Sequence, residues 1–415
     1  MASPPSSPPF GAAPEAGRDR RRDVGFWLFL AHLATVWGIA VSNVFHGLTL
    51  LWLGHAWWRR RPRRPRWRWR RVRPLIVPLA LYVLLLWLAI ALSREPRVSF
   101  GHFGEVLTVS TLPLALVLVR GAGAARRVVD VLIGVELLLA VFGIVQYYFT
   151  DYGAMDRRIP GPFSHYQTFA GVLMIGALLI LARLVTGQRW RRPGLWLAFG
   201  LVFWTLMLTL TRGPWLALGL VTAGFLLIYA RRVALAAALA VIAGLLLAPA
   251  EWRQRASSIG DLSDPSSYDR LCMVEAGLYM IGERPLFGLG PGMVRERYPI
   301  YRHPTAPRYT VSHLHNTFLH LAAERGLLAL ATYLWLMAAS LRLAWRGLRR
   351  AGGLGGPDAD LWLGTILVLA AFNVAGLFEA NWRDTEVQRL VLFVLALPLC
   401  LRPSSASPPP PARPT

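Results

Sequence analysis

Residues 75–93 read LIVPLALYVLLLWLAIALS, a run without a single charged side chain. A helix of about 20 apolar residues is long enough to cross the hydrocarbon core of a bilayer. Similar runs recur along the chain, and 55% of its 415 residues are hydrophobic. The sequence therefore predicts an all-α polytopic membrane protein. The period-two alternation typical of a membrane β-barrel is absent.

We expect about twelve transmembrane helices, with eleven as the alternative count. The expected spans are 26–42, 43–58, 75–93, 103–119, 128–149, 165–185, 194–210, 214–230, 233–249, 316–341, 360–378 and 387–401. The stretch 26–58 decides between the two counts, because it is long for one span and short for two. The basic residues before it favour a cytoplasmic start and a hairpin of two short helices that bends near Ser42 and Asn43.

The formal net charge is +23, and all 45 basic side chains are arginine. Arginine is concentrated in every second loop, namely 59–73, 120–127, 183–193, 231–232 and 342–350. The positive-inside rule places these loops in the cytoplasm and the long loop 250–315 in the periplasm. Tryptophan alternates with arginine in 59–73, a pattern also found in nucleic-acid-binding proteins. We favour contact with anionic lipid headgroups and expect no nucleic-acid partner.

These patterns divide the chain into five expected parts. They are a disordered cytoplasmic N-terminus (1–22), an N-terminal transmembrane bundle (23–249), a periplasmic loop or cap with short amphipathic helices (250–315), C-terminal transmembrane helices (316–401) and a disordered tail (402–415). Cys272 and Cys400 fall on opposite sides of this topology, so we expect no disulfide.

The turn in LTLTRGPWLAL (208–218) places Arg212 between two expected spans. Thr211 is suited to cap the second helix, while Gly213 and Pro214 set the turn. Arg212 then either extends its side chain to the membrane surface or binds an anion. On the turn alone, the first alternative is favoured.

The stretch DPSSYDRLCMVEAGLYMIGERPLFGLGPG (264–292) predicts a helix capped by Ser266 or Ser267. An apolar stripe formed by Leu271, Val274, Leu278 and Ile281 indicates that this helix lies along the membrane surface.

Arg270 lies in the first turn of that helix, where the helix dipole disfavours a cation. Its partner is either a bound anion or a neighbouring acid, Asp269 or Glu275. The glycines of GLGPG are similar to a phosphate-binding loop, but no β-strand precedes them, so we do not expect a nucleotide site.

The stretch SHLHNTFLHLAAERG (312–326) contains His313, His315 and His320. Their spacing is poor for a zinc site, so we expect no metal. A general base needs only one histidine, and His315 beside Asn316 at a helix start suits that role. The alternative is an interfacial histidine bonded to the backbone.

Taken in order, LTLTRGPWLAL, YDRL…RPLFGLGPG and HNTFLHLAAERGLLAL resemble the O-antigen ligase and polymerase family. The resemblance covers roughly residues 150–400 and includes RIPGPFSHYQTFAGVL (158–173). One position departs from the typical H-N-x-x-L-x(4)-E-x-G-x-x-G motif: its last glycine is Ala329, which is still small.

The resemblance implies a helical bundle with a periplasmic cap in the bacterial inner membrane. Such proteins transfer a glycan from undecaprenyl pyrophosphate to an acceptor hydroxyl, with inversion and without a metal or other cofactor. By this resemblance Arg212 and Arg270 hold the pyrophosphate and His315 activates the acceptor. Further candidate substrate contacts are Arg158, His313 and Asn316, while Asp384 and Glu386 are candidates to orient His315 or an arginine.

Three functions stay open. A ligase would use lipid A-core as acceptor, whereas a polymerase would use a second carrier-linked glycan. A transporter of lipid-linked sugars would favour mid-membrane charges, broken helices and repeated halves, which the sequence does not show clearly. We favour the ligase because the central loop is compact and the His-Asn motif is well kept.

Overall fold

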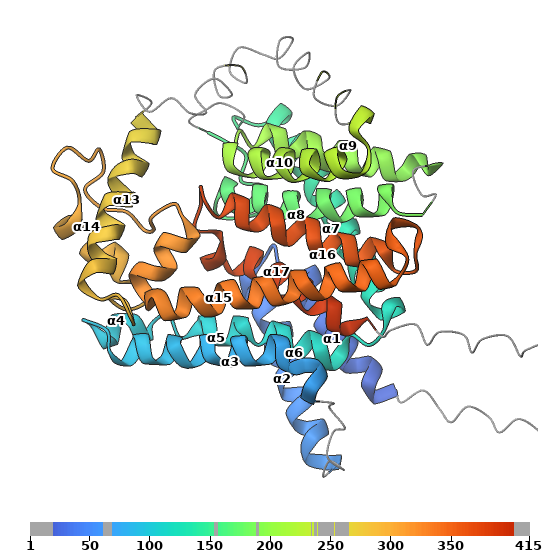
Figure 1. Cartoon of the computed structure of the whole chain (residues 1–415), viewed down its shortest axis with the longest axis horizontal. Coiled ribbons are helices and arrows are strands. Elements are labelled where there is room, and N and C mark those ends of the chain that lie inside the picture. Colours follow the sequence, from blue (N-terminus) through green and yellow to red (C-terminus); the bar gives the residue numbers. More distant parts are fainter. Residues whose placement is uncertain are drawn as a thin grey trace, which may run out of the picture.

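The computed structural model describes residues 20–60, 69–152, 157–187, 191–233 and 265–401, and three single residues at 235, 239 and 253. All regular secondary structure in this part of the chain is helical (Figure 1). The predicted all-α class is therefore confirmed. The expected N-terminal segment and C-terminal tail lie largely outside the described residues.

The N-terminal half contains ten helices in the described ranges. They are α1 (Arg20–Ala34), α2 (Ile39–Arg60), α3 (Trp69–Ala91), α4 (Pro96–Phe100), α5 (Gly104–Val109), α6 (Thr111–Leu118), α7 (Ala122–Phe149), α8 (Tyr166–Val185), α9 (Pro193–Leu208) and α10 (Arg212–Tyr229). Residues 265–401 then form α13 (Pro265–Glu283), α14 (Met293–Tyr301), α15 (Thr317–Arg350), η2 (Gly353–Gly355), α16 (Ala359–Ala375), η3 (Asn381–Arg383) and α17 (Thr385–Cys400).

Six described segments are long and apolar enough to cross a membrane: α3, the α4–α6 segment Pro96–Leu118, α7, α8, α10 and α15. Three shorter apolar helices accompany them, at Val24–Ala34, Pro193–Leu208 and Ala359–Ala375. The expected span 233–249 falls almost entirely outside the described residues. A polytopic helical protein is thus supported, and the count of about twelve stays a prediction.

The N-terminal hairpin bends earlier than the sequence predicted. Helix α1 ends at Ala34 and α2 begins at Ile39, so Ser42 and Asn43 lie inside α2. Their polar side chains make contacts between helices instead of a turn: the Ser42 hydroxyl donates to the His32 carbonyl at 2.8 Å, and Asn43 accepts from Arg389.

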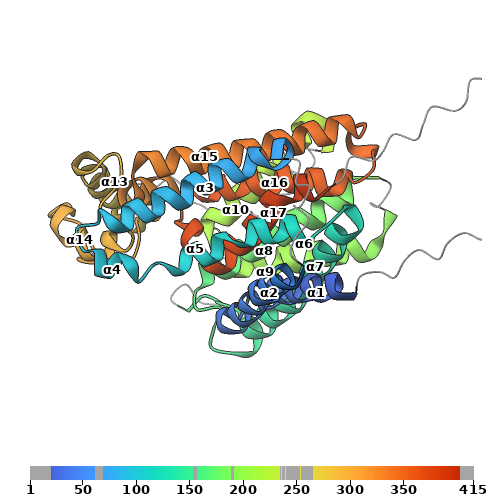
Figure 2. The same ribbon diagram turned by 90° about the horizontal axis from the view of Figure 1, so that it is seen from below.

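The centre of the molecule is formed by α8, α16 and α17, which pack on one another (Figures 1 and 2). Almost every side chain of α8 and α17 is buried, as expected for helices that are apolar on all sides. Helix α15 packs along α3, and α9 and α10 contact α8.

The two kinds of loop gather at opposite ends of the bundle. At one end, Arg126 pairs with Asp358 at 2.8 Å, and the Gly121 N–H donates to the Cys400 carbonyl at 2.9 Å. The opposite end carries the Arg212 turn, the start of α15 and the α16–α17 connection. The arginine-rich turns are therefore separated from the sequence motifs by the length of the helices.

Helices α13 and α14 form a small cap across that second end, with α13 running across the bundle axis in Figure 1. The cap has its own core, built around Met273, Met280, Met293 and Tyr298. Leu271 and Leu278 face away from this core and are 47% and 59% exposed. That this helix lies along the membrane surface stays a prediction.

Two details of the cap helix differ from the prediction. Helix α13 begins at Pro265, so Ser266 and Ser267 lie in its first turn instead of capping it. Proline suits this position because the first helical N–H has no partner within the helix. Ile281 is only partly exposed and packs against the cap core.

The glycine-rich segment after α13 fastens the cap to α15. Leu289 N–H donates to the Ala323 carbonyl and Gly290 N–H to the Glu324 carbonyl, both at 2.9 Å. The Glu324 carboxylate accepts from the N–H groups of Gly292 and Val294 at 2.9 and 3.3 Å. The N–H groups of this backbone are already bonded to α15 and are not directed at a phosphate. This agrees with the interpretation that GLGPG is no phosphate loop.

Candidate functional site

One cavity of about 870 Å³ at the cap end collects four residues proposed from the sequence: Arg158, Arg212, Arg270 and His315. They come from the segment before α8, the start of α10, the cap helix α13 and the loop before α15. The fold thus brings together side chains separated by up to about 160 positions. Of the remaining candidates, His313 and Asn316 do not line this cavity.

Arg212 is the first residue of α10 and is only 7% exposed. The turn before it is tight, since Leu210 adopts a left-handed backbone with φ of 51°. Thr211 occupies the N-cap position, but its hydroxyl donates to the Thr209 carbonyl at 3.0 Å, so the predicted side-chain cap is wrong. The burial of Arg212 in the cavity wall argues against simple extension to the membrane surface.

Arg270 lines the cavity one residue after a buried acid. Asp269, one of the alternative partners of Arg270, pairs instead with Nε of Arg308 at 3.1 Å. Arg308 lines the same cavity. The sequence reasoning missed it because it lies in a polar loop without periodicity or a recognisable motif.

Arg158 is held over the ring of Tyr166, with its guanidinium carbon 4.8 Å from the ring centroid. Tyr166 opens α8 and lines the cavity as well. Stacking of this kind stabilises a guanidinium without neutralising its charge.

The electrostatics of the cavity favour an anion. Four guanidinium groups line it, against the carboxylates of Asp269 and Glu379. The N-termini of α8 and α10 also lie in its wall, where the backbone N–H groups carry partial positive charge. Planar guanidinium groups bind phosphate oxygens in pairs and stay charged at all physiological pH values.

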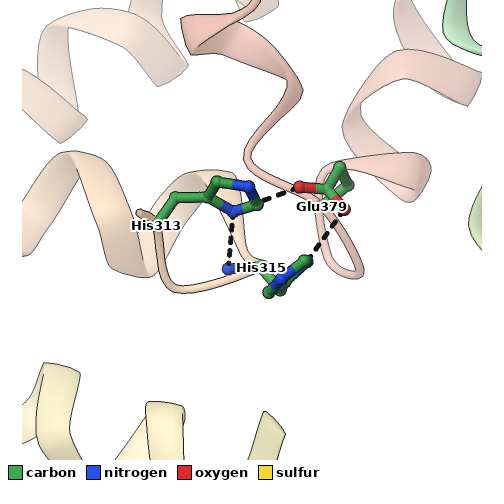
Figure 3. A group of neighbouring side chains, drawn as sticks. All are labelled: His313, His315 and Glu379. Carbon is green, nitrogen blue, oxygen red and sulfur yellow. Dashed lines mark hydrogen bonds and ion pairs between the residues drawn. The ribbon is translucent and has the colours of Figure 1, made fainter. Parts of the chain in front are cut away.

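Glu379 orients the histidines and was not predicted. Glu379 is 8% exposed, and its carboxylate accepts from Nδ1 of His315 at 2.9 Å, the Ala380 N–H at 3.0 Å and the Gln167 amide. Nδ1 of His313 lies 3.2 Å from the same carboxylate and accepts from the His315 N–H at 3.4 Å (Figure 3). If Nδ1 of His315 carries the proton given to Glu379, its Nε2 is the unprotonated nitrogen.

These contacts set the charge of the cluster. Burial opposes ionisation of Glu379, but the hydrogen bond from His315 and the neighbouring histidines outweigh it and lower the pKa of Glu379 to about 2. Burial lowers the pKa of His313 to about 3, more than Glu379 raises it. At neutral pH the cluster therefore contains an ionised carboxylate beside a neutral His313.

The backbone at His315 is itself unusual. Its φ is 47°, a left-handed conformation that is rare outside glycine. Residues held this way cluster at functional sites, because the surrounding structure must fix them. Here the Glu379 bond and the start of α15 do so.

Asn316 has a structural task. Its Oδ1 accepts from the Leu319 N–H at 2.9 Å and caps α15, and its amide donates to the Leu377 carbonyl at 3.2 Å. Its role as a substrate contact stays a prediction.

Asp384 and Glu386 do not orient His315. Asp384 accepts from the Thr168 hydroxyl at 3.2 Å, while Glu386 lies near Arg389 at the start of α17. Glu379 fills the proposed role, five residues before Asp384. Its only local signal is an acid after an apolar run, which spacing does not connect to His315.

The ligand atoms of His313, His315 and Glu379 lie within 4.8 Å of one another, close enough to hold a metal ion. Two histidines and a glutamate are a donor set used by zinc enzymes. The expectation of no metal rested on the spacing of the histidines along the chain, which does not show Glu379 beside them. His320 takes no part in this group and pairs with Glu324 at 3.3 Å. In the described geometry the carboxylate already accepts from Nδ1 of His315.

Comparison with protein families finds a match to the O-antigen ligase model over residues 197–334. This range contains Arg212, Arg270 and His315, and it ends before Glu379. Comparison with curated proteins finds no match.

Proposed function

We propose that this chain, which matches the O-antigen ligase family model over residues 197–334, transfers a glycan from undecaprenyl pyrophosphate to an acceptor hydroxyl. The observation that carries the proposal is the joining of four arginines and an oriented histidine in one cavity. The first group suits a pyrophosphate and the second an acceptor hydroxyl.

The reaction needs a base at the acceptor. Nε2 of His315 takes the proton of the acceptor hydroxyl while the oxygen attacks the anomeric carbon from the face opposite the leaving group. Glu379 stabilises the imidazolium that forms. Positioned bases of this kind contribute about 100- to 10,000-fold in rate.

The leaving group needs positive charge. As the bond between the anomeric carbon and the phosphate oxygen breaks, its electron pair moves to the pyrophosphate. Arg212 and Arg270, supported by Arg158 and Arg308, are placed to stabilise that charge. Each well-placed donor contributes about 2–4 kcal/mol, by analogy with oxyanion holes. The balanced reaction gives an inverted glycoside and undecaprenyl pyrophosphate, and it uses no metal ion.

We place the cavity at the periplasmic face of the bacterial inner membrane. Lipid A-core is the proposed acceptor, as in a ligase. The polymerase alternative uses the same chemistry with a second carrier-linked glycan. A transporter is less suited to the site, because moving a lipid-linked sugar does not require a histidine oriented by a buried carboxylate.

Transfer in proteoliposomes tests the proposal. Purified protein receives carrier-linked glycan with either lipid A-core or a second carrier-linked glycan. We expect Arg212→Gln and Arg270→Gln each to reduce kcat/KM about 30- to 1,000-fold. Arg295→Gln is the matched control, since Arg295 is exposed on α14 and does not line the cavity.

The acceptor that becomes glycosylated distinguishes ligase from polymerase. If Arg212→Gln and Arg270→Gln both transfer glycan at the wild-type rate, the two arginines do not stabilise the leaving group. Movement of labelled carrier across the bilayer without transfer would favour the transporter.

A further inference from the structure

A second cavity, of about 660 Å³, lies between the α4–α5 connection, α15 and the start of α17. Its rim contains Gly101, His102, Gly104 and Arg383, which are exposed. Its floor contains Glu324, Arg325 and Gln388, which are only 4%, 3% and 2% exposed. An open rim above a polar floor is the form of a binding site rather than of a packing defect.

The charged floor is held rigidly from several sides. Arg325 donates to Glu105 and lies 3.4 Å from Oε2 of Glu324. Glu105 also accepts from the Tyr82 hydroxyl at 2.6 Å, and Trp382 donates to Tyr82 at 2.9 Å. Such a network preorganises its groups before a ligand arrives.

Two polar atoms of the floor have no partner among the described residues: Nε2 of Gln388 and Nε of Arg325. Both atoms have almost no accessible surface, so they lie beneath the cavity wall. An unpaired buried donor of this kind costs about 1–3 kcal/mol.

The mixture of groups identifies the ligand class. Arg383 and the Thr385 hydroxyl offer donors, while Glu105, whose two oxygens each accept one hydrogen bond, offers further acceptor lone pairs. An anion could use the donors alone and would be repelled by the carboxylates of Glu105 and Glu324. A sugar hydroxyl both donates and accepts, and two acids against two arginines leave the cavity nearly neutral.

The second cavity adjoins the first through one segment. Glu379 and Asn381 line the first cavity, whereas Arg383, Thr385 and Gln388 line the second. Arg383 also donates to the Ser312 carbonyl at 3.1 Å, three residues before His315. Inversion requires the acceptor to approach the anomeric carbon from the side opposite the leaving group, which two cavities on either side of this segment would permit.

We propose that the second cavity is a sugar-binding subsite for the acceptor, which it holds through hydroxyl groups while the first cavity holds the pyrophosphate. This inference rests on the proposed function for the identity of the acceptor. The binding of a neutral sugar chain there can be tested without any transfer.

The binding test uses a single introduced thiol. Cys272 and Cys400 are buried, at 3% and 4% exposure, so Thr385→Cys supplies the reactive thiol inside the cavity. Maleimide labelling is measured with the delipidated, dephosphorylated core oligosaccharide or with inorganic pyrophosphate. We expect the oligosaccharide to slow labelling at least fivefold and pyrophosphate to have no effect. Arg295→Cys, on the cap surface, should be labelled at the same rate throughout.

The kinetic test uses Gln388→Leu and Arg383→Gln in the proteoliposome assay. Loss of one ligand hydrogen bond weakens binding about 3- to 10-fold. We therefore expect KM for the acceptor to rise by that factor while KM for the donor stays constant and the melting temperature does not fall. Arg295→Gln again serves as control.

The outcomes separate the two proposals. If the oligosaccharide slows labelling of Thr385→Cys but no glycan is transferred, the subsite is supported and the proposed transfer reaction is wrong. Transfer with unchanged acceptor KM in both variants and no protection overturns the subsite. Protection by pyrophosphate, or a rise in donor KM alone, assigns the cavity to the donor and also overturns it.

Discussion

Glu379 joins three segments of the chain that lie far apart in sequence. Its carboxylate accepts from Gln167 of α8 and from His315 in the loop before α15, and His313 lies beside it. A buried carboxylate in this position fixes the tautomer of His315, and in the proposed reaction it would stabilise the imidazolium. The histidine motif therefore gains this partner only when the α16–α17 connection folds against it.

Asp384 offers a pH-dependent test of this region. Burial, followed by the nearby Glu379 and Glu386, raises the pKa of Asp384 to about 7 from an ordinary 3.8. Between these values the folded state binds more protons, so the free energy of unfolding falls as pH rises from 4 to 7. We expect Asp384→Asn to gain stability over wild type across that range, by about 1–2 kcal/mol between pH 5 and 7.

The measurement is the melting temperature in detergent at pH 5, 6, 7 and 8. The difference between Asp384→Asn and wild type should widen up to pH 7 and then level off. A difference that does not change with pH would show that Asp384 ionises at its ordinary pKa in the folded protein.

At the scale of elements, α15 links the cap to the bundle. Its backbone breaks helical geometry at Gly326, where φ is 82°. A Cβ at this position would clash with the Leu286 carbonyl. The E-x-G part of the motif thus has a structural explanation: Glu324 holds the start of α14, and Gly326 lets the segment after α13 approach.

Gly326→Ala should therefore destabilise the protein. The left-handed backbone and the clash with main-chain atoms together predict a loss of about 2 kcal/mol or more. Gly282→Ala is the matched control, since Gly282 is exposed on α13 and an added Cβ meets nothing within 4 Å. The control should keep or raise the melting temperature. Equal melting temperatures for both variants and wild type would contradict this explanation.

The elements also show where sequence reasoning succeeds. Apolar runs predicted α3, α7, α8 and α15 because a bilayer imposes length and composition on a helix. The boundaries of the basic loop 59–73 were less predictable, since arginine is a good helix former and α2 continues to Arg60.

The site was predictable to the extent that its residues belong to local motifs. Arg212, Arg270 and His315 each carry a local signal, whereas Glu379 and Arg308 act through partners distant in sequence. Spacing along the chain does not encode those contacts, so only the fold brings these residues to the site.

At the scale of the whole molecule, the arginine-rich turns and the two cavities lie at different ends of the helices. Both cavities lie near the end that carries the cap. If the positive-inside rule holds, the cavities face the periplasm.

Thiol accessibility tests that orientation. We expect Arg295→Cys, on the cap, to react with a membrane-impermeant maleimide added to spheroplasts. Arg349→Cys, exposed at the far end of α15, should react only after the membrane is disrupted. The reverse pattern would place the site in the cytoplasm and exclude a periplasmic acceptor.

The most direct test of the account is the transfer rate of His315→Gln in proteoliposomes containing EDTA, compared with wild type, Glu379→Gln and His303→Gln. His303 lies in the loop after α14, bonds Thr305 and does not line the cavity, so it is the matched control. We predict undiminished transfer by wild type and His303→Gln with the chelator present, and a loss of about 100- to 10,000-fold in His315→Gln and Glu379→Gln. Wild-type rates in His315→Gln, or loss of wild-type activity in EDTA that zinc restores, would contradict a metal-independent histidine base.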